Sequence, residues 1–181
     1  MIDVAIQYGL ADWADVDADG RLDILLAGNV LDSDGFFRTV LRTYRGQAGG
    51  NYVVTDMAEP AVLWLDLHAA TWADLDSDGD VDLLATGSYV GAGKIEGRSL
   101  IYGNDGSGQL SALAVQLPAP QSSIGHGGAF TWCDIDNDGD LDYLVAGGYP
   151  VIGGNGLVEA RMQLFRNQTP AVNAAPTPPA L

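Results

Sequence analysis

The stretch Asp74-Leu75-Asp76-Ser77-Asp78-Gly79-Asp80-Val81-Asp82 decides the fold, because its pattern occurs three times along the chain. The other copies are Asp15–Asp23 (DVDADGRLD) and Asp134–Asp142 (DIDNDGDLD). The three copies start 59 and 60 residues apart, so the chain is a tandem array. In each copy alternate carboxylates can point into one small space, and a glycine permits the turn that closes it. Such a cage of oxygens suits a hard cation such as Ca²⁺.

The residues that flank each loop repeat as well. A tryptophan lies two residues before every loop, and an apolar run that ends in glycine follows it. Short apolar runs bounded by glycine are typical of buried strands, so each loop is predicted to join two strands of a β-hairpin. A tryptophan at the same place in every unit favours packing between units over stacking on a ligand. These tryptophans are Trp13, Trp72 and Trp132.

The loops do not fit the helix-loop-helix calcium site. That site needs a bidentate acid at loop position twelve and helical periodicity on both flanks. Position twelve is apolar in all three copies, as Leu26, Ala85 and Val145, and the flanks have the pattern of strands. The last acid of each loop stands at position nine instead.

Further strand candidates follow each hairpin. They cover residues 39–44 and 52–55 in the first unit, 99–102 and 113–117 in the second, and 161–165 in the third. The first two of these candidates are separated by a predicted glycine-rich turn at 46–51. Four antiparallel strands per unit at this period predict an all-β fold of propeller blades, three per chain. The third unit lacks its fourth strand.

These boundaries predict one domain over residues 1–168, followed by a Pro/Ala-rich tail or linker at 169–181. The blades are expected at about 7–56, 66–117 and 126–168, and residues 1–6 are a possible closing strand. Cys133 replaces Ala14 and Ala73 of the other units, which predicts a small buried side chain.

The repeated pattern W-x-D-hydrophobic-D-x-D-G-x-hydrophobic-D resembles the FG-GAP repeats of integrin α chains. It is closer still to the related VCBS repeats of bacterial extracellular proteins. The resemblance covers roughly residues 1–168. It implies a β-propeller, usually of seven blades, with Ca²⁺ between the first two strands of some blades, and an extracellular or secreted location. The chain departs from that pattern in blade number.

The resemblance also implies a ligand set for about three Ca²⁺ per chain. Twelve aspartates would supply carboxylates, and the residue at position seven of each loop would supply a backbone carbonyl. The implied carboxylate ligands are Asp15, Asp17, Asp19, Asp23, Asp74, Asp76, Asp78, Asp82, Asp134, Asp136, Asp138 and Asp142, and the position-seven residues are Arg21, Asp80 and Asp140.

The charge of the chain is acidic and local. There are 24 acidic against 8 basic residues, a formal charge of −16, and 14 of the acids lie within the three loops. We therefore do not expect the chain to bind nucleic acid or an anionic membrane through charge alone. No stretch is long enough to insert into a membrane. The N-terminus shows neither the basic nor the apolar region of a signal peptide, so a cytosolic protein and part of a secreted one both remain open.

Three function classes agree with this sequence. The first is a noncatalytic, calcium-stabilised module for interaction or adhesion. The second is a carbohydrate-binding propeller, for which exposed aromatics such as Trp64, Tyr89 and Tyr149 would be the candidates. The third is a fragment of a polysaccharide-active enzyme. The sequence offers no nucleophile–base pair and no acid pair outside the metal loops, so we expect a noncatalytic protein.

Three blades leave two sheet faces and one strand edge to be covered, since an unpaired edge promotes aggregation. Two chains could form a six-bladed ring as a homodimer, in which Ile2–Ile6 of each chain supplies the fourth strand of the partner's third blade. The competing account is a piece of a longer propeller.

Overall fold

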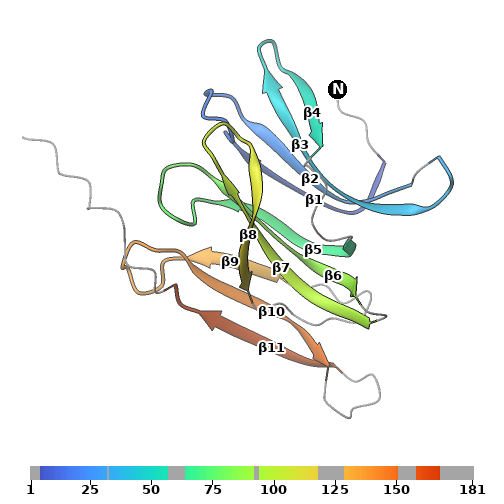
Figure 1. Ribbon diagram of the computed structural model, residues 1–181, viewed down its shortest axis with the longest axis vertical. Coiled ribbons are helices and arrows are strands. Elements are labelled where there is room, and N and C mark those ends of the chain that lie inside the picture. The colour runs from blue at the N-terminus through green and yellow to red at the C-terminus, as the bar shows by residue number, and fades with distance from the viewer. Residues whose placement is uncertain are drawn as a thin grey trace, which may run out of the picture.

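Three antiparallel β-sheets follow one another along the chain and stack face to face (Figure 1). The structure is a computed structural model, which describes residues 5–31, 33–56, 64–91, 94–117, 129–150 and 158–167. In the first two sheets, four consecutive strands are neighbours in chain order, and the third sheet has three strands within the described residues. The all-β prediction is confirmed, and each sheet has the meander topology of a propeller blade.

The first sheet consists of β1 (Ile6–Ala14), β2 (Asp23–Leu31), β3 (Phe37–Gln47) and β4 (Asn51–Asp56). The second consists of β5 (Trp64–Ala73), β6 (Asp82–Gly91), β7 (Lys94–Asn104) and β8 (Leu110–Leu117). The third consists of β9 (Ala129–Cys133), β10 (Asp142–Pro150) and β11 (Val158–Phe165).

The observed strands contain the predicted ones and extend beyond them. Gly46, which was expected in a turn, lies instead in β3, where it pairs with Tyr52. A Cβ at this position would lie 2.6 Å from the carbonyl oxygen of Leu22, so glycine is required by the close approach of the first metal loop. Ile6 is the first residue of β1 and pairs with Val30. The remaining residues of the proposed closing strand, together with the tail at 169–181, lie outside the described residues, apart from Ala5.

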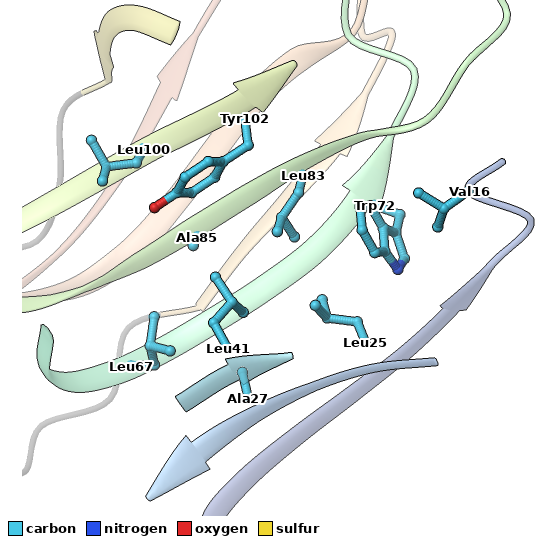
Figure 2. Packing of buried hydrophobic residues seen from close by; sticks show 10 residues of the cluster. All are labelled: Val16, Leu25, Ala27, Leu41, Leu67, Trp72, Leu83, Ala85, Leu100 and Tyr102. Carbon is cyan, nitrogen blue, oxygen red and sulfur yellow. The ribbon is translucent and has the colours of Figure 1, made fainter. Parts of the chain in front are cut away.

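Two hydrophobic cores fill the spaces between neighbouring sheets. Successive residues of a strand point to opposite faces, so Leu83 of β6 faces the first sheet and Leu84 faces the third. Both side chains are fully buried. Figure 2 shows Trp72 and Leu83 of the second sheet pointing toward Val16 and Leu25 of the first. The middle blade is therefore buried on both faces.

The repeated tryptophans have different environments. Trp72 packs in the core between the first two sheets, and Trp132 packs against Tyr143 in the second core, with ring centroids 5.2 Å apart. The prediction of packing between blades is confirmed for these two. Trp13 is 54% exposed, since none of the three described sheets covers the corresponding face of the first blade.

The expectation that Cys133 is buried was wrong, because its side chain is exposed. Cys133 follows Trp132 in β9, so the alternation of the strand turns it away from the second sheet. The equivalent Ala14 packs against the first core, because a following sheet covers that face in the first blade.

Polar contacts fix the first strands of neighbouring sheets. One carboxylate oxygen of Asp12 in β1 accepts hydrogen bonds from the Thr71 hydroxyl at 2.7 Å and from the Trp72 backbone N–H at 3.1 Å, both in β5. β5 in turn contacts β9. The first strands thus lie side by side, as they do around the axis of a propeller. Within the described residues, no helix is long and apolar enough to span a membrane.

We expect Trp72→Ala to lower the free energy of unfolding by about 3–5 kcal/mol, because it empties a large site between two sheets. Trp13→Ala is the matched control, since Trp13 occupies the equivalent position on an exposed face and its loss should cost far less. Denaturant unfolding followed by circular dichroism, at protein concentrations low enough to prevent self-association, measures both. Equal losses for the two variants would contradict the assignment of these faces.

Candidate metal centres

Each acidic motif forms the connection between the first two strands of its sheet. We name them loop 1 (residues 15–23), loop 2 (74–82) and loop 3 (134–142). Each begins directly after β1, β5 or β9, and its ninth residue is the first residue of β2, β6 or β10. Antiparallel pairing of these strands brings the two ends of every loop together.

The three loops share one backbone conformation. The residue at position four has a positive φ in each of them, 54° at Ala18, 58° at Ser77 and 61° at Asn137. The glycine at position six has φ values of 86°, 99° and 96° in the same order. At each of these glycines an added Cβ would have nothing within 4 Å, so the backbone angle rather than space is the reason for glycine.

This conformation turns alternate carboxylates toward one point. In each loop three aspartates can place one oxygen apiece within 4.8 Å of one another. Four or five like charges crowd each motif, so their mutual repulsion opposes this arrangement unless a cation lies among them. The clusters are Asp15, Asp17 and Asp19; Asp74, Asp76 and Asp78; and Asp134, Asp136 and Asp142.

The aspartate at position one organises the turn. In loop 1 the two oxygens of Asp15 accept the backbone N–H groups of Asp19 and Gly20, at 2.9 and 2.8 Å. In loop 3 Asp134 binds the backbone N–H groups of Asp138 and Gly139 in the same way, at 3.1 and 3.0 Å. These bonds hold the turn closed and leave further lone pairs of the same oxygens for a cation.

Two carboxylate oxygens in the loops test whether a cation fits. Oδ1 of Asp17 and Oδ1 of Asp74 are buried and have no hydrogen-bond partner within the described part of the chain. A buried acceptor without a partner is costly, and a charged one more so. Both belong to the clusters above, where a bound Ca²⁺ would satisfy them, so the donor set fits a calcium ion.

The aspartate at position nine has a second role, which the sequence did not reveal. Asp82 is buried, and its oxygens accept the backbone N–H of Leu75 in loop 2 at 3.1 Å and that of Asn104 at the end of β7 at 2.9 Å. Asp23 and Asp142 make the corresponding pairs of bonds, to Val16 and Gly46 and to Ile135 and Asn167. One buried carboxylate per blade therefore ties the loop to the end of the third strand.

The predicted ligands are thus brought together in part. Of the position-nine residues only Asp142 belongs to a cluster found among the described residues. Direct coordination by Asp23 and Asp82 therefore stays a prediction, as does coordination by the backbone carbonyls at position seven. Asp138 is not part of the loop 3 cluster and accepts the backbone N–H of Asp140 at 3.0 Å, so its coordination of a metal also stays a prediction.

Arginines neutralise part of the charge in loops 1 and 3. The Arg45 guanidinium lies 3.1 Å from Asp17 and 3.4 Å from Asp23, and that of Arg21 pairs with Asp19. In loop 3 Arg166 lies 2.9 Å from Asp136. A cation that enters loop 1 therefore competes with two guanidinium groups for the same carboxylates. The sequence analysis did not identify these ion pairs, because Arg45 is 22 residues from Asp23 and Arg166 is 30 residues from Asp136.

The titration of the loops follows from crowding. Desolvation, followed by the neighbouring Asp78 carboxylate, raises the pKa of Asp76 above its ordinary value of 3.8. Desolvation also raises the pKa of Asp82, although two backbone N–H groups oppose the shift. A raised pKa means that the folded state binds protons before the unfolded chain does. Without metal, the free energy of unfolding should therefore rise as the pH falls toward 3.8, because protonation removes the cost of burying these two charges. The same protonation should weaken cation binding.

The comparison with known families agrees with these loops. Residues 74–145 match the family model for the FG-GAP-like repeat. The FG-GAP-like segment begins at loop 2, includes loop 3 and ends in β10, so the resemblance inferred from the sequence is confirmed there. No curated protein matches the chain.

We expect Asp82→Asn to destabilise the protein even in chelator, by about 1–3 kcal/mol. The amide can accept only one of the two backbone hydrogen bonds, and it leaves a buried N–H group without a partner. Asp76→Asn is the matched control in the same loop. It removes a repelling charge, so it should leave the metal-free protein as stable as before, or more stable, and should reduce only the stabilisation by Ca²⁺. Thermal unfolding of both variants in chelator and in Ca²⁺ separates the two roles, and a similar loss for both in chelator would contradict them.

Proposed function

We propose that this chain is a calcium-stabilised, noncatalytic β-propeller module for interaction or adhesion. The observation that carries the proposal is one loop conformation that occurs at the same connection of three stacked sheets and brings three carboxylates together each time. A structural role for the metal, in which it stabilises each loop, needs only repeated sites of this kind. Loops that differed from one another would favour a single specialised centre instead.

The metal would supply positive charge where the fold concentrates negative charge. Hydrogen bonds connect loop 1 to the neighbouring blade. The Asn104 side chain, in the second blade, donates to the carbonyl oxygen of Val16 in loop 1 at 2.8 Å and to that of Val81 at 3.0 Å. Arg45, which pairs with Asp17 and Asp23, also donates to the carbonyl oxygen of Gly108 in the β7–β8 turn. Order in loop 1 therefore supports the packing of blade two on blade one.

The noncatalytic part of the proposal rests on the sequence, in which the acid clusters belong to the metal loops and no nucleophile–base pair accompanies them. An extracellular location is proposed with it, because calcium modules of this kind suit a compartment where the free ion is abundant. The partner would be a protein surface, and nucleic acid is disfavoured by the charge of −16.

We expect calorimetry to show about three Ca²⁺ per chain and chelation to lower the melting temperature, since metal that binds the folded state alone stabilises it. Mg²⁺ should substitute poorly, because a many-oxygen cage suits the larger ion. Loop 1 should fill last, as its arginines compete with the ion. Asp17→Asn, Asp76→Asn and Asp136→Asn, made singly, should each remove about one site and so assign the binding steps. A chain that melts identically in chelator and in millimolar Ca²⁺ would refute the proposal.

A second candidate function, carbohydrate binding, is favoured by a cavity between the second and third sheets. The cavity has a volume of about 290 Å³. Aromatic side chains and charged or amide groups both line this cavity, a combination that can stack on a sugar ring and bind its hydroxyls. Asp76 of loop 2 is among the lining residues, which would make binding depend on calcium. The aromatic lining residues are Trp132, Tyr143 and Phe165, and Arg166 and Asn167 supply the charged and amide groups.

A glycan array probed with and without Ca²⁺ separates the two functions. Calcium-dependent binding that is lost in Arg166→Ala, in the cavity lining, would select the carbohydrate module. Absence of binding to any glycan would leave the protein-interaction module. The sequence also suggested three aromatic candidates, whose side chains are not among those that the structure describes. They are Trp64, Tyr89 and Tyr149.

A further inference from the structure

The two internal interfaces are built from the same sequence positions, so each blade has a leading and a trailing face. The leading face, which packs on the preceding blade, carries the repeated tryptophan and alternate residues of the second strand, such as Trp72, Leu83 and Ala85. The trailing face, which receives the next blade, carries position two of the metal loop and the intervening residues of the second and third strands. In the first blade these are Val16, Leu25, Ala27 and Leu41.

The trailing face of the third blade is apolar and exposed. At position two of the metal loop, Val16 is 2% exposed beneath the second blade and Leu75 packs in the second core, but Ile135 is 53% exposed. Met162 pairs with Ala146 as Leu41 pairs with Ala27. Leu41 is 6% exposed and Met162 is 72% exposed.

Two neighbouring residues extend this exposed face. Leu164 pairs with Leu144 in the position where Ile101 pairs with the fully buried Leu84, yet Leu164 is exposed and Ile101 is buried. Cys133, which follows Trp132, is exposed on this side as well. The third blade thus presents apolar residues at positions that are buried in the first two blades, where Thr43 and Ser99 are the polar equivalents of Leu164 and Met162.

The leading face of the first blade is the matching half. Trp13, Ile24 and Val54 occupy the row that contains Trp72 and Leu83 in the second blade. Trp13 and Val54 are exposed and Ile24 is half-buried, whereas Trp72 and Leu83 are buried. Tyr44, which lies between Ile24 and Val54 in this row, is buried. Among the described residues, one end of the stack therefore carries an exposed trailing face and the other a partly exposed leading face.

We propose that a second copy of this chain covers both faces, head to tail. The trailing face of blade three (Ile135, Met162 and Leu164) packs on the leading face of the partner's blade one (Trp13, Ile24 and Val54). The same chemistry already joins blade one to blade two and blade two to blade three, so the contact continues an interface that the fold contains. A second copy brings both halves of it.

The number of blades sets the size of this assembly. Propellers close with about four to eight blades. Two copies of the three described blades make six, a number within that range, so the pair can close a ring with two identical junctions. The junctions are heterologous, but the pair as a whole has a two-fold axis along the centre of the ring. The contact between faces does not depend on whether residues 2–6 exchange strands.

Light scattering of the full chain in Ca²⁺ tests the proposal. We expect a dimer, and we expect Trp13→Asp and Met162→Asp to raise its Kd by about tenfold or more, since each puts a charge into a junction core. Phe37→Asp is the matched control, because it adds the same charge to an exposed aromatic at the hairpin end of β3. A monomeric parent chain, or a dimer that is indifferent to both face variants, would overturn the proposal.

Mixing the two variants tests the head-to-tail direction. Each variant alone has one damaged partner at both junctions, whereas a mixed pair keeps one junction intact. Mixing Trp13→Asp with Met162→Asp should therefore restore heterodimers, detectable by native mass spectrometry. If like faces met instead, one variant would dimerise alone and mixing would restore nothing. Circular dichroism and the Ca²⁺ stoichiometry of each variant, expected to be unchanged, separate failure of this contact from failure of the calcium sites.

Discussion

A buried aspartate at the end of every metal loop is the constraint on which each blade depends. Asp23, Asp82 and Asp142 each bind one backbone N–H in the loop and one at the end of the third strand. These bonds close the loop, fix where the third strand ends and place the residue at position two on the trailing face, where Val16 and Leu75 pack in the cores. Loss of the carboxylate would leave two backbone N–H groups without their acceptor at a buried position. Hydrogen bonds from backbone N–H groups to this carboxylate therefore support the hairpin geometry without requiring a metal ion.

The same carboxylates create the problem that a cation would solve. Alternate aspartates must converge for the loop to turn, and burial together with like charges raises the pKa of Asp76. Arg45 relieves the repulsion in loop 1 by bridging Asp17 and Asp23, and it also reaches the next blade through Gly108. Loop 3 uses Arg166 on Asp136. Calcium and arginine are thus alternative partners for one set of charges, and the loops differ in how much of the charge is left for the ion.

The sequence predicted the strands and loops well because their causes are local. Glycine at position six and carboxylates at alternate positions follow from the turn itself, and apolar runs mark the strands on either side. What the sequence did not show depends on packing between distant segments. Gly46 was expected in a turn because its reason for being glycine, contact with the Leu22 carbonyl, involves another strand. Cys133 was expected to be buried because Ala14 supplied the analogy, but only Ala14 has a following sheet to cover it.

Differences in exposure between equivalent residues of the three blades show which faces of the blades are covered. Trp13, Trp72 and Trp132 occupy the same position of the repeat, so their unequal exposure reflects what lies beside each blade. Had Trp13 evolved only for a solvated face, a large apolar side chain would have no role there, since an exposed apolar patch usually marks an interaction site. Ile135 and Met162 present the complementary case at the other end of the stack. Because the chain builds this interface twice between its own blades, the chemistry that would cover its ends is already defined within it.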